Sequence, residues 1–258
     1  MQIHQPRLAE MVADALRDRI IGGQLKDGDG LPRQEDLLAE FNVSRPSLRE
    51  ALRILEAEGL ITVRRGNLGG AVVHSPRVGN AAYSVGLVLQ SRGVPMTDLR
   101  DAIKGIEPVC AGLCAARADR HEKVLPALRA VHDQVVAAID DEVEFTMTSR
   151  RFHEQLVAVC GNETLILVVG ALESLWSSRE EAWARDASAT GEFPDPKKRR
   201  SGVRAHEAIL KSIEDGEVDK VQRQARVHLE SSLLYAVEAD SGKSVEASAP
   251  RLTWNVGA

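Results

Sequence analysis

Residues 43–60, VSRPSLREALRILEAEGL, constrain the fold of this 258-residue chain more than any other stretch. Four apolar residues recur at the helical period and predict a buried face: Leu48, Ala51, Leu52 and Leu55. Three arginines recur at every fourth residue and predict a separate cationic face: Arg45, Arg49 and Arg53. Ser44 is a favourable N-cap, and Pro46 suits a first helical turn because no partner awaits its missing N–H. The stretch predicts a short, capped helix with one apolar and one positively charged face.

The flanking segments complete a recognisable order of elements. Residues 8–22 and 34–41 each predict a helix, the second one short. Two β-prone runs, Ile61–Val63 and Ala71–Val73, enclose a turn rich in Gly and Asn, which favours a hairpin. The order of helix, helix, turn, helix and hairpin predicts a winged helix-turn-helix, which places its recognition helix in the major groove of DNA. A solvated face on an ordinary bundle helix would explain the arginines alone but not this whole order.

Residues 31–73 resemble the DNA-binding domain of the GntR family of bacterial transcription regulators. The resemblance is carried by Leu31-Pro32, Val43-Ser44-Arg45, Leu48–Leu52, Leu55, Glu58-Gly59-Leu60 and the Arg64–Gly66 wing. It implies DNA contacts from the recognition helix and from the wing, at Ser44, Arg45, Ser47, Arg49, Arg65 and Gly66.

One position departs from the family pattern. The family usually has Arg where this chain has Glu35, a residue expected to face DNA. A carboxylate cannot bind a phosphate or a guanine edge, so either Arg33 takes over the contact or Glu35 accepts a hydrogen bond from a cytosine amino group. We therefore expect an operator that differs from the commonest one of the family.

The remaining chain predicts an all-helical domain. Aromatic residues make up 3% of the chain, and Ala, Leu and Val are plentiful, which favours packed helices. We expect a mostly α protein: a DNA-binding domain of three helices and a two-stranded β wing at 1–74, a linker at 75–80 and a helical-bundle effector domain at 81–240. The last residues, 241–258, are expected to form a disordered tail. Residues 186–202 predict a polar loop whose basic run, Lys197–Arg200, is solvated.

Segments of the second domain resemble the all-helical effector domain of the FadR branch of this family, the FCD type. They are IEPVCAGLCAARA, RRFHEQLVAVCGN, RAHEAILKSIEDGE and ARVHLESSL. Metal-binding members hold a divalent ion inside the helical barrel, and their three His ligands map onto His153, His206 and His228. Neutral imidazoles from three helices suit Zn²⁺ or Ni²⁺. By spacing alone these histidines signal nothing, and three polar residues near a helical core are the alternative.

Two further departures concern this effector site. The family usually has Asp four residues before the first His, where this chain has Ser149, so water, the effector or a distant carboxylate would complete the site. Members that bind carboxylates often have Arg four residues before the match to Glu107, where this chain has Ile103. Arg100 lies on roughly the same helix face and is expected to stand in. The resemblance thus implies a small organic acid as effector, near Arg100 and Ser149.

Bulk properties narrow the function classes. The net charge of −5 argues against a non-specific, architectural DNA binder but allows a local basic patch. Three cysteines fit reduced thiols, and no apolar run is long enough to span a bilayer, so we expect a cytoplasmic protein. The leading hypothesis is a homodimeric repressor on a pseudo-palindromic double-stranded DNA operator, controlled by its effector. The alternative is a metal-dependent hydrolase with a DNA-binding module, although the chain lacks HExxH and a nucleophile elbow.

Overall fold

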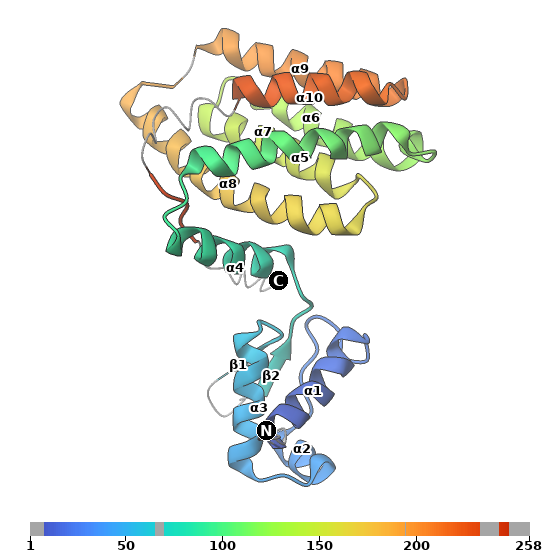
Figure 1. The fold of residues 1–258 in the computed structure, drawn as a ribbon, viewed down its shortest axis with the longest axis vertical. Coiled ribbons are helices and arrows are strands. Elements are labelled where there is room, and N and C mark those ends of the chain that lie inside the picture. The colour runs from blue at the N-terminus through green and yellow to red at the C-terminus, as the bar shows by residue number, and fades with distance from the viewer. Residues whose placement is uncertain (1–7, 65–69, 194, 233–242, 248–258) are drawn as a thin grey trace, which may run out of the picture. The chain divides into compact units, whose positions relative to one another are not determined.

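The computed structural model describes residues 8–64, 70–193, 195–232 and 243–247. The chain divides into two compact units, residues 1–80 and 81–258. The first unit holds α1 (Leu8–Ile21), α2 (Gln34–Phe41), α3 (Arg45–Ala57), β1 (Ile61–Arg64) and β2 (Gly70–Val73) (Figure 1). The predicted fold class, a winged helix-turn-helix followed by an all-helical domain, is confirmed.

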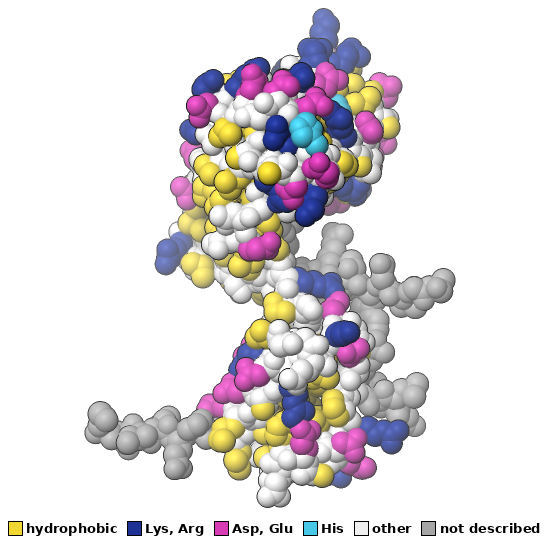
Figure 2. Space-filling view, turned by 90° about the vertical axis from the view of Figure 1, so that its right-hand side faces the viewer, with side chains coloured by type: hydrophobic (Ala, Val, Ile, Leu, Met, Phe, Trp, Pro, Cys, Tyr) yellow, Lys and Arg dark blue, Asp and Glu magenta, His cyan; other side chains and the backbone are white. Residues whose placement is uncertain are grey.

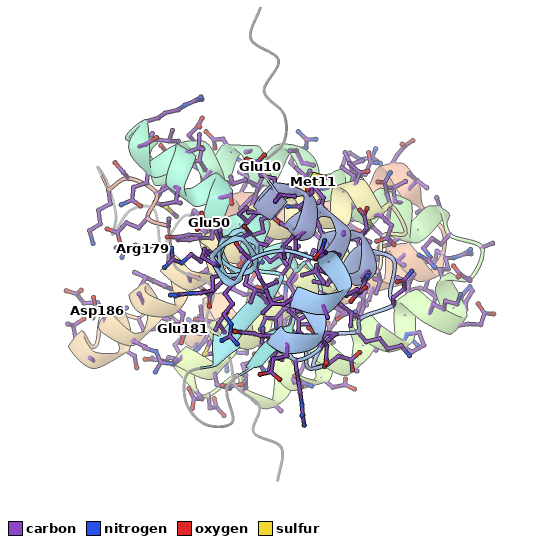
Figure 3. The ribbon with its side chains drawn as sticks, turned by 90° about the horizontal axis from the view of Figure 1, so that it is seen from below. Glu10, Met11, Glu50, Arg179, Glu181 and Asp186 are labelled. Carbon is purple, nitrogen blue, oxygen red and sulfur yellow. The ribbon has the colours of Figure 1, made fainter. Side chains whose placement is uncertain are left out.

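The first unit packs around the apolar face of α3. Leu48, Ala51, Leu52 and Leu55 are all buried, as their spacing predicts. They meet the buried face of α1, which includes Val12 and Leu16, whereas Met11, labelled in Figure 3, is exposed. Ser44 caps α3 as predicted, because its hydroxyl oxygen accepts the Ser47 backbone N–H at 3.4 Å. The cap and the buried row together fix which side of α3 faces outward.

The wing is a two-stranded antiparallel ladder. Ile61 lies opposite Val73, and Arg64 lies opposite Gly70. Ile61 and Val73 bury their side chains in the same core as α3, so the ladder is anchored at its base. The tip, residues 65–69, lies outside the described residues, and with it the predicted DNA contacts Arg65 and Gly66.

The second unit is helical throughout its described secondary structure, apart from one isolated β-bridge. Its elements are α4 (Val78–Ser91), α5 (Met96–Ala116), the π-helical turn η1 (Arg120–Val124), α6 (Leu125–Ala137), α7 (Glu142–Ala158), α8 (Glu163–Thr190), α9 (Pro196–Glu214) and α10 (Val218–Ser232). α5 lies beside α10, and α7 lies between α6 and α8 (Figure 1). In the part of the chain that the structure describes, no helix is both long and apolar enough to cross a membrane.

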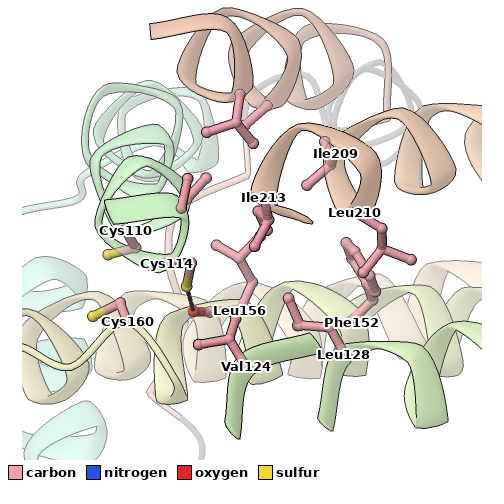
Figure 4. Packing of buried hydrophobic residues seen from close by; sticks show 14 of the residues in the cluster. Cys110, Cys114, Val124, Leu128, Phe152, Leu156, Cys160, Ile209, Leu210 and Ile213 are labelled. Carbon is pink, nitrogen blue, oxygen red and sulfur yellow. Dashed lines mark hydrogen bonds between the residues drawn. The ribbon is translucent and has the colours of Figure 1, made fainter. Parts of the chain in front are cut away.

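The core of this unit includes the three cysteines (Figure 4). Cys110, Cys114 and Cys160 are free thiols, as predicted, and all three are buried. The Cys114 thiol donates a hydrogen bond to the Leu156 carbonyl oxygen at 3.3 Å, and burial raises the pKa of this thiol to about 12. The Cys114 thiol therefore stays protonated, and the three buried cysteines pack as small apolar groups.

The predicted loop at 186–202 is much shorter in the structure. α8 continues to Thr190, where Gly191 ends it with a left-handed φ of 72°. α9 then begins at Pro196, because Asp195 caps it by accepting the Lys197 backbone N–H at 2.6 Å. The expectation that the run Lys197–Arg200 is solvated is wrong for Arg199, which is only 7% exposed.

The predicted tail also differs where the structure describes it. The Val245 backbone N–H donates to the Val94 carbonyl at 2.9 Å, and the Met96 N–H donates to the Lys243 carbonyl at 3.2 Å. Val245 is buried, so residues 243–247 dock onto the connection between α4 and α5. The expectation of disorder is wrong for these residues, because an apolar side chain and two backbone hydrogen bonds hold them. Residues 241–242 and 248–258 lie outside the described residues.

Candidate DNA-binding face and effector cavity

The exposed end of α3 gathers the residues expected to contact DNA. Ser44, Arg45 and Arg49 are exposed, and Ser47 is half-buried. Ser44 and Ser47 place their hydroxyl oxygens 3.0 Å apart, so both lie at the N-terminal end of the helix. N-terminal residues of a recognition helix are the ones that reach base edges in the major groove.

The arginines of this unit differ in what they bind. Arg17 pairs with Glu58, Arg19 with Glu40, and Arg77 with Asp27. Arg33, Arg45 and Arg49 form no ion pair with any residue that the structure describes. An exposed guanidinium without a protein partner keeps its N–H donors for phosphates and bases.

Two neighbouring residues refine this picture. Arg53, the third arginine of the row, lies 3.5 Å from Glu50, which Figure 3 labels on α3. Glu35 is exposed in the first turn of α2, and Arg33, which is also exposed, directly precedes that helix. Both predicted roles, a replacement contact by Arg33 and a cytosine contact by Glu35, are compatible with this exposure.

The helical unit brings three distant histidines together. His153 comes from α7, His206 from α9 and His228 from α10, and their ligand nitrogens all lie within 4.8 Å of one another. All three are buried, with exposed fractions between 1% and 6%. The Nε2 atoms of His206 and His228 are 3.0 Å apart, and Phe152 stacks on the His206 ring at 4.0 Å.

Glu107 of α5 orients the first of these rings. The His153 Nδ1–H donates to the Glu107 carboxylate over 2.6 Å, and Glu107 is buried. This hydrogen bond leaves Nε2 of His153 as the ligand nitrogen and fixes the plane of the ring. Sequence reasoning used Glu107 only as a reference position. The sequence feature that could have identified it is a single carboxylate on the apolar, alanine-rich face of a predicted helix.

The electrostatics of the cluster favour metal ligation. Burial lowers the pKa of His206 well below its usual value and lowers that of His228 to about 3, with the neighbouring rings adding to the effect. Both rings are therefore neutral at pH 7 and have a free lone pair. Burial alone would raise the pKa of Glu107, but the His153 ring and the Arg150 guanidinium outweigh it and lower that pKa. Glu107 is thus a buried carboxylate in contact with the His153 ring.

The donor set fits a divalent transition metal. Nitrogens in a tetrahedral zinc site lie about 3.3 Å apart, given Zn–N distances of roughly 2.0–2.1 Å. The 3.0 Å between His206 and His228, and the 4.8 Å limit for the whole triad, require only small side-chain adjustments to reach this geometry. Three His ligands also leave an open position for a further donor, as Zn²⁺ and Ni²⁺ sites allow.

A cavity of about 560 Å³ adjoins the triad. Its lining comes from α7 to α10 and from the connection between α8 and α9, and it includes His153, His228, Ser149, Arg150, Glu180, Trp183, Phe193, Arg199, Gly202 and Ala205. Ser149, a predicted effector contact, is therefore in this cavity. Arg100, the other one, is not among the described lining residues, and its guanidinium pairs with Asp101 at 2.9 Å.

Two buried arginines line the cavity instead, and sequence reasoning missed both. Arg150 pairs with Glu173 and, at 3.2 Å, with Glu180. Glu180 also accepts the Trp176 indole N–H at 2.9 Å, and burial raises its pKa despite the nearby guanidinium. Arg199 is the second, on α9. Each belongs to a basic sequence run, RRFH or PKKRR, and such runs usually lie on a solvated surface.

Comparison with known proteins follows the two-unit division. Residues 8–72 match the family described as bacterial regulatory proteins, gntR family, and residues 98–231 match the FCD domain. The chain is 26% identical to the HTH-type transcriptional repressor NanR of Klebsiella aerogenes, over 87% of this chain and 84% of that protein. It is 30% identical to the HTH-type transcriptional regulator YcbG of Bacillus subtilis, over 67% and 69%. A solved structure, Streptococcus agalactiae GntR, has a similar fold, with a TM-score of 0.67, 21% identity, and coverage of 86% and 97%.

Proposed function

Because the chain belongs to the GntR family of bacterial transcription regulators and carries an FCD domain, we propose that it is a repressor controlled by a small organic acid. The matched families and relatives are transcription regulators rather than enzymes. One relative, 26% identical to this chain, is named as a transcriptional repressor, which supports repression rather than activation. The observation that carries the proposal is the buried histidine triad beside a cavity, on a chain whose α3 exposes Arg45 and Arg49 without an ion-pair partner among the described residues.

The proposed DNA contacts come from the N-terminal half of α3. Arg45 and Arg49 reach phosphates or guanine edges, and Ser44 and Ser47 position the helix on the backbone. Arg33, directly before α2, and Glu35, on α2, extend this face, and Arg65 and Gly66 extend it on the wing. A homodimer presents two such helices to a pseudo-palindromic operator. Charges of both signs are interspersed on the face of the helical unit seen in Figure 2, and the gntR match covers residues 8–72, so we assign DNA binding to the first unit.

The proposed effector site uses the triad and the cavity together. His153, His206 and His228 hold a divalent ion, Zn²⁺ or Ni²⁺, and Glu107 holds the His153 ring in place. A bound ion supplies a Lewis-acidic position that a carboxylate of the effector can occupy. Ser149 lines the cavity where the family has an Asp ligand, so the smaller side chain leaves this position to the effector.

The effector controls DNA binding by preferring one dimer geometry over another. A ligand with equal affinity for both geometries would shift nothing, so the cavity must change shape or ordering between them. A coupling of about 1–3 kcal/mol suffices for a response of 5–150-fold in operator affinity. We place this regulator in the cytoplasm, where its operator is.

Metal content and operator binding test the proposal. Untagged protein, purified without chelators, should contain close to one zinc or nickel ion per protomer by elemental mass spectrometry. His228→Ala should lose the ion, whereas His121→Ala should keep it, because His121 is exposed on η1. Binding to promoter DNA should then weaken on addition of small carboxylic acids. A wild-type protein without metal, or DNA binding that no acid alters, would contradict the effector proposal.

A further inference from the structure

We propose that the effector carries two anionic groups, one at the histidine triad and the other, a carboxylate or a phosphate, at Arg199. This inference rests on the proposed effector site and names the chemical class of its ligand. Arg199 lies on α9, is 7% exposed and lines the cavity. Arg199 is therefore a buried cation in the wall of a cavity large enough to hold a small ligand.

Two nitrogens of the Arg199 guanidinium have no hydrogen-bond acceptor among the described residues. Its Nε and Nη1 atoms are buried and have no hydrogen-bond partner, and the nearest carboxylate oxygen, Oε1 of Glu142, is 3.9 Å from Nη1. The guanidinium lies over the Phe193 ring, 5.6 Å from its centre. Buried N–H donors are rarely left unsatisfied, and the planar guanidinium matches the two oxygens of a carboxylate or phosphate. A ligand anion would therefore satisfy Arg199 as no described side chain does.

Arg150, the other buried arginine of the cavity, also has buried Nε and Nη2 atoms without a well-oriented hydrogen bond, but it differs from Arg199 in its close ion pairs. Its charge is already matched by Glu173 and Glu180, which both pair with it. Binding a ligand anion at Arg150 would require these carboxylates to give up their partner. The second anionic group is therefore assigned to Arg199 rather than to Arg150.

The spacing along α9 sets the shape of the ligand. Arg199 and His206 are seven residues apart on the buried face of this helix, about two turns or roughly 10 Å. Between them Gly202 and Ala205 line the cavity. A Cβ atom built on Gly202 would have one described neighbour within 4 Å, the Phe145 ring at 3.8 Å. The cavity wall between Arg199 and His206 is therefore unobstructed at this position. An elongated ligand can therefore reach both ends at once.

The walls of the cavity indicate the body of this ligand. Trp183 and Phe193 have ring centres 5.5 Å apart, and Phe145 and Val227 add further apolar surface. Apolar walls with few polar contacts at fixed points are typical of sites that select a hydrocarbon or ring body. The expected ligand is thus an acid with a second anionic group at the far end of a largely apolar chain or ring.

Calorimetric titration of the zinc-loaded full chain tests this inference. The probes are adipate, pimelate and suberate, the monocarboxylates of equal chain length, and ω-phosphonoalkanoates of equal chain length. Each second anion should improve affinity about tenfold or more, the usual range for charge-assisted hydrogen bonds. Arg199→Gln should remove this gain and leave metal content and monocarboxylate affinity unchanged. Arg199→Lys should keep part of the gain, because it retains the charge but not the planar fork.

Two further variants make the outcome specific. Arg200→Gln removes the same charge from an exposed neighbour outside the lining and should keep the full gain. Gly202→Leu should obstruct the cavity between Arg199 and His206 and abolish the gain from the second anion without loss of metal. Equal affinities for monoacids and diacids, or a gain that survives Arg199→Gln, would overturn this inference but leave the proposed effector site standing. If no acid binds the zinc-loaded protein, the proposed effector site fails as well. A larger gain with phosphonates than with dicarboxylates would support the inference and identify phosphate as the second group.

Discussion

Glu107 and His153 are joined by a 2.6 Å hydrogen bond from the ring Nδ1 to the carboxylate, and both residues are buried. The His153 ring stacks parallel to His228, with ring centres 5.1 Å apart. This relationship between α5 and α7 orients the first of three converging imidazoles before any ligand arrives. Carboxylate–histidine pairs of this kind position metal ligands and raise their basicity.

Glu107→Gln should therefore weaken metal binding. The amide oxygen can still accept the Nδ1–H, but the negative charge that raises the basicity of the ring is lost. We expect metal affinity to fall about 10–100-fold, as for other partners of metal-bound histidines. Competition with a chromophoric chelator measures it, with Glu122→Gln, on an exposed position, as the control. Equal affinities in the two variants would show that Glu107 does not support a metal ligand.

Arg49→Ala should weaken operator binding in one of two distinguishable ways. If Arg49 contacts a phosphate, the slope of log affinity against log salt concentration should shrink by about one. If it reads a base, affinity should fall for the cognate site only, by about 1–3 kcal/mol. Fluorescence anisotropy with cognate and scrambled duplexes separates the two cases. Arg204→Ala, which removes an exposed charge from the helical unit, is the control. Unchanged binding to both duplexes would remove Arg49 from the DNA-binding face.

The Asp27 carboxylate should stabilise the folded first unit at neutral pH and lose this effect in acid. Its carboxylate accepts the Ser75 backbone N–H at 2.9 Å and pairs with Arg77 at 2.8 Å, and these contacts lower the pKa of Asp27 below 3.8. Since the folded pKa is depressed, the contribution is present above pH 3.8 and lost as pH falls through the folded pKa. Asp27→Asn should lower the free energy of unfolding by less than about 1 kcal/mol at pH 7, since the pair is exposed. Urea unfolding at pH values from 7 to 3 measures the difference in unfolding free energy between wild type and variant. A difference that grows toward pH 3 would contradict the expected pH dependence.

Val245→Ala should destabilise the helical unit. The side chain is buried beside the connection between α4 and α5, so its truncation loses apolar contact and leaves a small void. We expect a loss of about 1–2 kcal/mol in the free energy of unfolding, in the range of small core truncations. Val136→Ala, at an exposed helix position, should cost no stability. If the two variants unfold at the same urea concentration, residues 243–247 do not contribute to the fold in solution.

Local sequence determined the DNA-binding unit almost completely. Three features of α3 depend on residues spaced at most four positions from one to the next. They are the cap at Ser44, the buried row from Leu48 to Leu55 and the exposed row of Arg45 and Arg49. Short-range periodicity and capping are readable without knowledge of the remaining chain. The same holds for the hairpin, whose two β-prone runs flank one Gly-rich turn. The length of the loop at 186–202 was overestimated because Asp195 and Pro196, the cap and first residue of α9, were not recognised as a helix start.

The effector site, by contrast, was decided by tertiary packing. His153, His206 and His228 carry no signal in their spacing, and only the packing of α7, α9 and α10 places their nitrogens within 4.8 Å. The resemblance to a family supplied these three residues, but neither the Glu107 partner nor the burial of Arg199 could be read from it. Burial depends on which helices cover a side chain, and those helices come from distant parts of the chain. The sequence by itself thus determined the proposed DNA-binding face, and only the tertiary structure decided which side chains surround the proposed effector cavity.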